Sequence, residues 1–456
     1  MFAKSQHAYF IGIGGIGMSG IAEILLGLGM RVSGSDLRRS AVTERLAQLG
    51  ATIYEGHSEA HVSGSTVVVA SSAVSESNAE ILEARKQKIP VIQRAEMLAE
   101  LMRLKFGIAI AGMHGKTTTT SMVAAVLAAG GLDPTVVVGG RVDAMGSNAR
   151  LGSTQFMVVE ADESDRSFLK LSPILAIVTN LDREHMDCYR DMADIEQAFL
   201  AFMDRVPFYG AVTACIDNDL LAAILPRTRR RVLTYGAASN ADYRLQLLQT
   251  PATGFSRFLI DGPQGPLGPF ELHVPGRHNV LNATAAVAIA HQLEVPSEKI
   301  ALGLSHFRGV DRRFHRRGEA RGIVVVDDYG HHPTEIRATL AAARECGYSR
   351  IHVVFQPHRY TRTRDLLDEF VSAFAGADTL TLLPIYAASE EPIPGVSAEV
   401  LAETIRQPQA HFVADFPAAI HEVCGCAREG DLILTLGAGS VSQLAPQILD
   451  ALQAGC

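Results

Sequence analysis

The strongest constraint on the fold is an opening that recurs three times: a short run of β-prone apolar residues, then glycines, then a helical pattern. It reads "AYFIGIGG" from Ala8, "FGIAIAGMHGK" from Phe106 and "GIVVVDDYGHH" from Gly322. Alternating strand and helix patterns fill the intervals, which is typical of parallel sheets covered by helices on both faces. A chain of 456 residues has the length of about three domains. We therefore predict an α/β protein in which each opening starts a domain.

The predicted domains are residues 1–104, Rossmann-like; 105–315, a P-loop-type ATPase domain with a parallel sheet; and 316–456, Rossmann-like again. The first boundary follows the helical stretch "RAEMLAELMR", and the second lies within the charged stretch "RRFHRRGEARG". Between about 226 and 275, "RVLTYG", "RFLI" and "FELHV" are separated by glycine and proline turns. This pattern predicts a small antiparallel appendage on the central domain.

Charge and composition narrow the class of partner. The formal net charge of −8 argues against general affinity for nucleic acid or for anionic membrane surfaces, so small molecules are the expected partners. None of the six cysteines forms a C-x-x-C pair, which favours reduced thiols. The apolar run "MVAAVLAAGGL" is too short to cross a bilayer, and the N-terminus leads directly into a strand without room for a signal peptide. We predict a cytoplasmic protein.

The first glycine loop, "GIGGIGMSG", places Gly12, Gly14 and Gly17 in G-x-G-x-x-G spacing between a strand and a helix that begins around Met18. Such glycines let backbone amides and a helix N-terminus approach a pyrophosphate. Asp36 ends the next strand, where a carboxylate can accept hydrogen bonds from a ribose. The pattern predicts a bound nucleotide diphosphate and does not distinguish NAD from a UDP-sugar; a tight turn without a ligand is the alternative.

The second loop, "AGMHGKTTTT", departs from the strict P-loop because Ile110 stands where a glycine is required. Amides at Gly112, Gly115 and Lys116, the Lys116 ammonium and the Thr117 hydroxyl are still the groups that hold phosphates and Mg²⁺. A threonine-rich helix start without a ligand is the alternative. Because β-branched residues are poor helix formers, the run Thr117–Thr120 favours a nucleotide site.

Acidic residues follow two neighbouring strand candidates. "FMVVEADESD" supplies Glu160, with Asp162, Glu163 and Asp165 close behind. "ILAIVTNLDREHMD" supplies Asn180, Asp182 and His185. Hard oxygen ligands beside a phosphate loop predict a Mg²⁺ site, for which we select Glu160 and His185. Neighbouring Asp or Glu residues can replace either ligand, and a solvated acidic loop is the alternative.

Two further pairs have residues three apart. Arg359 and Arg362 in "PHRYTR" follow a strand where a helix can begin, so both can face one anionic ligand, or else form a solvated helix start. Asn279 and Asn282 in "GRHNVLN" can contact a ligand or cap a helix.

Taken together, the motifs resemble the ATP-dependent Mur ligases over nearly the whole chain. The resemblance rests on an ordered series of motifs: "GIGGIGMSGIAE", "GMHGKTTTT", "EADESD", "NLDREHMD", "PGRHNVLNA", "FRGVDRRF", "DDYGHHPTE", "QPHRYTRT" and "LGAG". No lysine occurs from Met186 to Gly210, where sister ligases have a modified lysine, so the chain is most similar to the alanine-adding branch.

The resemblance implies a role for each domain. The first would hold UDP-N-acetylmuramate, the second MgATP, and the third L-alanine, which is joined to the lactyl carboxylate through an acyl phosphate with release of ADP and phosphate. The implied UDP-sugar contacts are Gly14, Gly15, Asp36, His57 and Ser71. The implied ATP contacts are Gly112, Met113, His114, Gly115, Lys116, Thr117, Thr118, His278, Asn279, Asn282, Arg313 and Asp328.

The resemblance also implies metal ligands and catalytic residues. Thr117, Glu160 and His185 would bind Mg²⁺. Tyr329, His331, Arg359 and Arg362 would surround the alanine. The residues carried over as catalytic are Lys116, His185, Arg313, Asp328, His331 and Arg359, and Arg312 would assist at the phosphates. A monomer or weak homodimer is expected.

The chain departs from the family pattern at three places. Met113 replaces a threonine, Ser440 follows "LGAG" where an aspartate is common, and "SNAE" at 77–80 lacks a proline. Three alternative functions stay open. They are a ligase of the same family that adds a recycled tripeptide, an NAD-dependent dehydrogenase, and a catalytically silent nucleotide-binding regulator.

Overall fold

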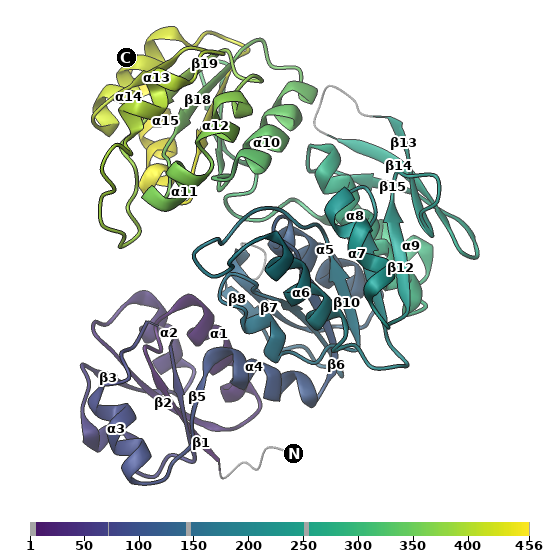
Figure 1. The fold of residues 1–456 in the computed structure, drawn as a ribbon, viewed down its shortest axis with the longest axis vertical. Helices are drawn as coiled ribbons and strands as arrows, with labels where there is room; N and C mark the ends of the chain where they lie inside the picture. The colour runs from purple at the N-terminus through teal and green to yellow at the C-terminus, as the bar shows by residue number, and fades with distance from the viewer. Residues whose placement is uncertain (1–5, 72, 143–146, 250–254, 456) are drawn as a thin grey trace. The chain divides into compact units, whose positions relative to one another are not determined.

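The computed structural model describes residues 6–71, 73–142, 147–249 and 255–455. Its chain divides into two compact units (Figure 1). The first comprises Met1–Gln246, Leu259–Phe270 and Leu281–Leu304, and the second comprises Leu247–Phe258, Glu271–Val280 and Ser305–Cys456. The first unit contains the first two of the three strand–glycine openings, and the second unit contains the third.

The N-terminal sheet has five strands in the order β3-β2-β1-β4-β5, and every pair is parallel. The strands are β1 (His7–Ile11), β2 (Arg31–Asp36), β3 (Thr52–Glu55), β4 (Val67–Ala70) and β5 (Val91–Gln93). The connecting helices are α1 (Ile16–Gly27), α2 (Ala41–Gln48), α3 (Ala79–Lys86) and α4 (Arg94–Arg103). All five residues of β1 are buried, as expected for the central strand of a sheet covered on both faces.

The central sheet has ten strands in the order β15-β14-β13-β12-β11-β10-β6-β9-β7-β8. Its first strands along the chain are β6 (Phe106–Ala111), β7 (Thr135–Val142), β8 (Ser147–Arg150), β9 (Phe156–Glu160), β10 (Leu175–Val178), β11 (Ala211–Cys215) and β12 (Val232–Gly236). The associated helices are α5 (Lys116–Ala129), α6 (Met192–Met203), α7 (Asp219–Ile224), α8 (Arg277–Gln292) and α9 (Ser297–His306). Strand β6 pairs in parallel with both β9 and β10, so their carboxyl ends lie at one edge.

The predicted appendage continues this sheet through β13 (Tyr243–Gln249), β14 (Ser256–Gly262) and β15 (Gly265–Leu272). One detail differs from the sequence analysis. The "RVLTYG" run forms β12, which pairs in parallel with β11 and with β13, and so extends the parallel part of the sheet. Composition alone does not distinguish parallel from antiparallel pairing, because a short β-rich run between turns suits either direction.

The C-terminal sheet has six strands in the order β16-β17-β21-β18-β19-β20, of which only β16 pairs antiparallel within the described chain. The strands are β16 (His315–Ala320), β17 (Ile323–Asp328), β18 (Ile351–Phe355), β19 (Thr379–Leu382), β20 (Ala410–Phe412) and β21 (Leu432–Leu436). The helices are α10 (Pro333–Glu345), α11 (Tyr360–Asp365), α12 (Leu367–Ala373), α13 (Ala398–Thr404), α14 (Phe416–Cys426) and α15 (Leu444–Ala454).

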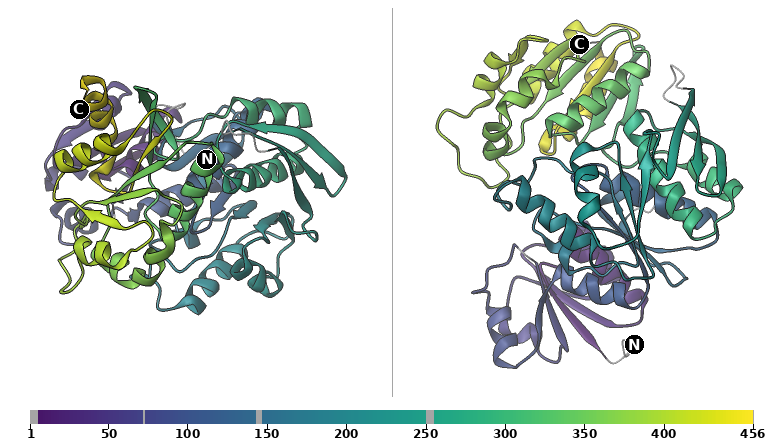
Figure 2. Two further views of the ribbon diagram at one scale, coloured as in Figure 1. Left: turned by 90° about the horizontal axis from the view of Figure 1, so that it is seen from above. Right: turned by 45° about the vertical axis from the view of Figure 1, so that its right-hand side comes forward.

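Alternating residues of these strands build two separate cores. Val353 and Phe355 pack in one cluster with residues of α10 and α12, whereas Val354 packs in another with residues of α14 and α15. Figure 2 (right) shows the green to yellow strands with helices on both sides. The predicted α/β fold class is confirmed. Among the described residues no helix has both the length and the hydropathy that crossing a membrane requires.

Candidate active site

A cavity of about 740 Å³ opens at the carboxyl ends of the N-terminal strands. Its volume lies in the range typical of small-molecule sites. All five residues predicted to contact a UDP-sugar line it, namely Gly14, Gly15, Asp36, His57 and Ser71. Arg38 and Arg39 line it as well and contribute positive charge. The prediction therefore identified residues that the fold brings to one pocket.

The first glycine loop is fixed against the end of β2. Gly12 has a φ of +78°, a conformation that favours glycine. The amides of Gly12 and Ile13 donate to the Ser35 carbonyl at 2.8 and 3.0 Å, and the Gly14 amide donates to Asp36 Oδ2 at 2.8 Å. A Cβ on Gly14 would lie only 2.8 Å from that carboxylate oxygen. Asp36 is therefore held beside the loop by the backbone itself.

The second loop connects β6 to α5 and is packed more tightly. Gly112 has a φ of +137°, and a Cβ there would lie 2.0 Å from Thr179 Oγ1. Gly115 has a φ of +81°, and a Cβ there would lie 2.9 Å from Asn282 Oδ1. Both positions require glycine for backbone conformation and for space. Asn282, predicted near the adenine, thus lies against the phosphate loop.

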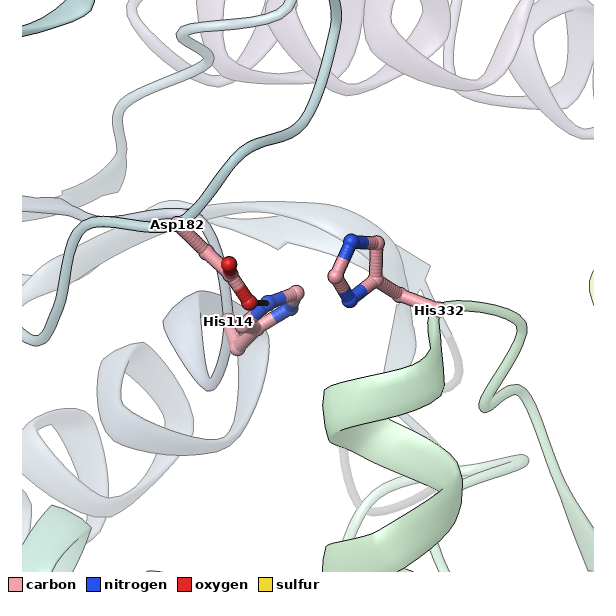
Figure 3. Close-up of side chains that lie close together, drawn as sticks. All are labelled: His114, Asp182 and His332. Carbon is pink, nitrogen blue, oxygen red and sulfur yellow. Dashed lines mark hydrogen bonds and ion pairs between the residues drawn. The ribbon is translucent and has the colours of Figure 1, made fainter. Parts of the chain in front are cut away.

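Residues at the end of β10 hold the second loop in place. Asn180 Oδ1 accepts from the His114 amide at 2.9 Å, and its Nδ2 donates to the His114 carbonyl at 3.0 Å. Thr179 Oγ1 donates to the same carbonyl at 2.6 Å. The His114 ring Nε2 lies 2.8 Å from Asp182 Oδ2, as drawn in Figure 3, which also draws His332 at the start of α10. The loop is therefore fixed through both its backbone and its histidine side chain.

Lys116 is the first residue of α5, and its ammonium group is largely buried. Nζ donates to the carbonyls of Gly112 and Met113 at 2.9 and 3.1 Å, and to Glu163 Oε1 at 2.7 Å. Burial acts to lower the pKa of Lys116, but the nearby carboxylates, above all Glu163 and Glu160, outweigh it and the net pKa is raised. Lys116 is therefore positively charged throughout the neutral range.

The three predicted metal ligands take part in two separate contacts. Thr117 Oγ1 donates to Glu160 Oε1 at 3.0 Å, which brings two of the three predicted ligands together. His185 Nε2 instead lies 3.4 Å from Glu163 Oε1, the oxygen that also accepts from Lys116. The buried Glu163 Oε2 has no hydrogen-bond partner within the described ranges. Hard oxygen atoms, one of them buried and unpaired, fit a divalent cation such as Mg²⁺.

In the second unit, Asp328 ends β17 and is buried. Its Oδ2 accepts from the Phe314 amide at 2.6 Å, and its Oδ1 accepts from the Gly330 amide at 2.7 Å. Burial raises the pKa of Asp328 above its ordinary value, and the nearby Arg313 partly offsets this rise. Asp328 therefore links the residue that precedes β16 to the turn that follows β17.

Arg312 and Arg313 both lie over the Tyr329 ring, with guanidinium carbons 4.8 and 5.1 Å from its centroid. Arg312 also donates to the carbonyl of Gly437 in the "LGAG" loop at 2.6 Å. Arg313 Nη1 lies 3.5 Å from Glu335 Oε1. Arg312 and Arg313, which are predicted to contact the ATP phosphates, thus lie over the ring of Tyr329, which is predicted to contact L-alanine.

His331 and the "PHRYTR" segment form a neighbouring basic group. The ring centroids of His331 and His358 are 5.8 Å apart, and Arg362 Nη1 donates to the His358 carbonyl at 3.1 Å. Arg359 has a φ of +71°, and its Nη1 lies 3.9 Å from Glu390 Oε1. Burial, then neighbouring basic side chains including His331 and Arg362, lowers the pKa of His358 to about 3. Such a positive environment suits an anionic ligand.

His278 and Asn279 lie in the first turn of α8. Burial, with a smaller effect from Arg313, lowers the pKa of His278 to about 4, so this ring is neutral at pH 7. Asn279 Nδ2 donates to the Pro275 carbonyl at 2.7 Å. Part of the hydrogen-bonding capacity of Asn279 thus serves the start of the helix.

The departures from the family pattern are accommodated locally. Met113 is buried and takes part in the loop through its backbone carbonyl, which accepts from Lys116. Ser440 Oγ donates to Gln356 Oε1 at 3.3 Å. The segment "SNAE", which lacks the usual proline, leads into α3 at Ala79, and Asn78 caps this helix by accepting from the Glu80 amide at 2.8 Å.

Comparison with known proteins identifies the family. Residues 7–106 match the model of the Mur ligase family catalytic domain, residues 110–290 the Mur ligase middle domain, and residues 312–439 the Mur ligase glutamate ligase domain. The chain belongs to the Mur ligase family. It is therefore a ligase, and its three matched segments follow the order of the three strand–glycine openings.

Two curated relatives of this Mur ligase match it from end to end. The UDP-N-acetylmuramate–L-alanine ligase of Acidobacterium capsulatum is 67% identical over 453 residues, covering 99% of each chain. That of Koribacter versatilis is 62% identical, covering 100% of this chain and 99% of the other.

Two solved structures are also similar to this Mur ligase. The UDP-N-acetylmuramate-alanine ligase MurC of Thermotoga maritima superposes with a TM-score of 0.79 at 29% identity, covering 99% of this chain and 100% of the other. A murein peptide ligase of Psychrobacter arcticus superposes with a TM-score of 0.69 at 25% identity, covering 98% and 99%.

Sequence reasoning missed three side chains that shape these sites in the Mur ligase. Thr179 and the ring of His358 occur within longer motifs but were not predicted as site residues, and the pairing of Glu163 with Lys116 was not predicted. A signal was present for Glu163, since it follows a buried strand next to the phosphate loop. Which of several acids there faces the lysine depends on the turn after β9, and the linear pattern does not specify it.

Proposed function

We propose that the chain joins L-alanine to the lactyl carboxylate of UDP-N-acetylmuramate, with conversion of ATP to ADP and phosphate through an acyl phosphate. The observation that carries this proposal is the largely buried Lys116 ammonium in the loop after β6, flanked by acidic ends of β9 and β10. The substrates are supported by the names of relatives at 67% and 62% identity.

The chemistry requires charge to be offset at a phosphoryl group. A carboxylate is a poor electrophile toward an amine, so its oxygen must first become a leaving group. Phosphorylation of the lactyl carboxylate supplies this leaving group, and the amine of L-alanine then displaces phosphate. Lys116 and Arg313 would offset the charge that develops during phosphoryl transfer, and the loop amides would orient the phosphates.

A metal ion fits the same place. Thr117, Glu160 and His185 would hold Mg²⁺, and Glu163 supplies a further carboxylate oxygen that is buried and unpaired within the described chain. Bound Mg²⁺ would neutralise negative charge on the phosphate oxygens. His278, Asn279 and Asn282 would contact the nucleoside.

Each of the three predicted domains would bind one substrate. Residues 1–104 would bind the UDP-sugar, 105–315 ATP, and 316–456 the amino acid. Tyr329, His331, Arg359 and Arg362 would form the alanine site, where the two arginines receive its carboxylate. The Asp328 carboxylate would contact ATP.

An ADP-release assay with UDP-N-acetylmuramate and ATP, offering each amino acid in turn, tests the proposal. We expect L-alanine to give the highest kcat/KM and the release to depend on Mg²⁺. A tripeptide acceptor included in the same series tests the alternative that the chain is a murein peptide ligase. Turnover with the tripeptide and none with L-alanine would contradict the proposal.

A further inference from the structure

Behind the N-terminal pocket lies a buried carboxylate that neither the motifs nor the proposed reaction assigns. The Glu80 side chain is 0% exposed and accepts five hydrogen bonds from the elements around it. Tyr9 OH donates to Oε1 at 2.6 Å, and Ser35 Oγ donates to Oε2 at 2.7 Å. The Ser58 amide donates to Oε1 at 3.3 Å. A charge buried this completely is tolerated only because so many donors surround it.

Two histidines complete the group, and their surroundings differ. His57 Nδ1 lies 2.8 Å from Glu80 Oε2, and His61 Nδ1 lies 3.1 Å from Oε1. His57 lines the cavity beside the glycine loop, whereas His61 does not line it and stacks on Tyr54 with ring centroids 4.1 Å apart. One carboxylate thus contacts a histidine at the pocket and a second one away from it.

The hydrogen-bond pattern fixes where the proton of His57 must be. Burial acts to raise the pKa of Glu80, but hydrogen bonds from Tyr9, Ser35 and the two histidines outweigh it, so the net pKa is lowered and the group is a carboxylate. A carboxylate only accepts, and the Ser35 hydroxyl, 3.0 Å from His57 Nδ1, already donates its own proton to Glu80. Nδ1 of His57 must therefore carry a hydrogen, and Nε2 is the ring nitrogen left for a ligand.

We infer that Glu80 is a positioning residue for the nucleotide pocket: it orients the His57 ring and holds its proton on Nδ1, so that Nε2 contacts a nucleoside diphosphate. In the neutral ring Nε2 accepts a hydrogen bond, which suits an N–H or O–H of the ligand's base or ribose. A carboxylate behind a histidine serves in the same way in metal sites, where the outer partner fixes the ring and its tautomer. The inference rests on the proposed UDP-sugar site.

A measurement on the wild-type chain tests the tautomer. In ¹H–¹⁵N correlation spectra of the full chain with ¹⁵N-labelled histidine, assigned with His57→Ala, we expect the neutral His57 ring to be protonated at Nδ1. Protonation of the neutral ring at Nε2 would overturn the inference whether or not the pocket binds UDP-sugars.

Binding measurements test the coupling. We expect Glu80→Gln and His57→Ala each to weaken UDP-N-acetylmuramate binding about tenfold, and the double variant to be no weaker than either, because both changes remove the same contact. His61→Ala is the matched control, because it removes another contact of Glu80 without touching the pocket; its affinity should stay within about twofold. The KM for ATP should be unchanged in all four variants.

The outcomes separate the two proposals. If the wild-type chain fails to bind UDP-N-acetylmuramate, the proposed substrate is wrong and this inference falls with it. If the wild type binds and the Glu80 and His57 effects multiply to about a hundredfold, Glu80 acts only by supporting the fold. An equal loss of affinity in His61→Ala would lead to the same conclusion.

Discussion

The two glycine loops of the first unit have the same backbone plan but hold different charged side chains. Each follows a strand that has parallel neighbours on both sides and leads into a helix, and each begins with a glycine at positive φ. In the first loop, the carboxylate of Asp36 accepts from the Gly14 amide, and a second carboxylate, Glu80, lies buried behind the pocket. In the second, the Lys116 ammonium lies within the loop and faces Glu163.

On the proposed function, the backbone of both loops would offer a site for phosphates, and side chains from neighbouring strands would decide the ligand. Helix N-termini and loop amides attract anions in both places. A carboxylate at the first loop suits ribose hydroxyl groups, and an ammonium at the second suits the β and γ phosphates. If the two loops are independent, a substitution in one loop should leave ligand binding at the other loop unchanged.

The largest effect is expected at the second loop. Lys116→Ala should lower ADP release by about a thousandfold or more, because charge at the transferring phosphoryl group is no longer offset. UDP-N-acetylmuramate binding at the first loop should stay within about twofold of wild type. Near wild-type turnover would contradict the role of this lysine.

The loss of activity must be separated from a loss of folding. Removing one member of a buried ion pair costs about 3–5 kcal/mol, since Glu163 would be left buried and unpaired. The double variant Lys116→Met/Glu163→Gln should recover most of this stability in urea denaturation and stay inactive. Lys170→Ala, at a lysine whose side chain is 35% exposed, is the control for deletion of an ammonium group.

The backbone requirement should also be stricter at the second loop. Gly112→Ala should cost about 3 kcal/mol or more in unfolding free energy, because it adds a clash with Thr179 to unfavourable φ. Gly12→Ala meets its nearest side-chain atom at 3.4 Å, so it should cost less. Gly131→Ala, at φ +81° with nothing within 4 Å, isolates the cost of φ, about 1–2 kcal/mol. Equal costs at all three glycines would contradict the packing difference.

The stability contributed by Glu80 and by Lys116 should be lost at opposite ends of the pH scale. The folded pKa of Glu80 is below its ordinary 4.5, so its contribution to stability is present above pH 4.5 and is lost as pH falls through the folded value. The difference in unfolding free energy between wild type and Glu80→Gln should therefore be constant above about pH 5 and shrink as the pH falls below 4.5. Tyr9, His57 and His61 face the same carboxylate and remain in both proteins.

Lys116 should behave in the opposite sense. Its folded pKa is above its ordinary 10.5, so its contribution is fully present below pH 10.5 and is lost only in stronger alkali. The difference between wild type and Lys116→Met should stay constant from about pH 6 to about pH 9 in urea denaturation. A change over that interval would mean that the ion pair with Glu163 is not maintained.

The smallest effect is expected at Met113. Its backbone carbonyl, not its side chain, accepts from Lys116, so Met113→Thr should change ADP release by less than about threefold. Loss of the buried side chain should cost about 1 kcal/mol. A change of about tenfold in the KM for ATP would instead show that the Met113 side chain contacts the nucleotide.

Much of this architecture could be predicted because strand and helix patterns are local. The runs that form β1, β2, β6, β9 and β17 are each predicted to be strands because their apolar, β-prone residues end at glycines or acids. The five predicted UDP-sugar residues line one cavity because parallel strands place their carboxyl ends at one edge. The domain boundaries and the roles of the individual site residues stay predictions.

The remaining features depend on contacts between residues far apart in the chain. Glu80 meets Tyr9 across 71 positions and Lys116 meets Glu163 across 47, and no local pattern selects these partners among several acids and hydroxyl groups. The parallel pairing of β12 likewise depends on its neighbour, β11.

The sequence by itself determined the α/β class, the strand–glycine openings and the chemical groups available at each, because periodicity and glycine placement act over a few residues. The tertiary structure alone decided which carboxylate faces Lys116 and which nitrogen of His57 is left for a ligand. Burial removes water as a partner, so each buried polar group must find its hydrogen bonds among whatever the fold brings beside it.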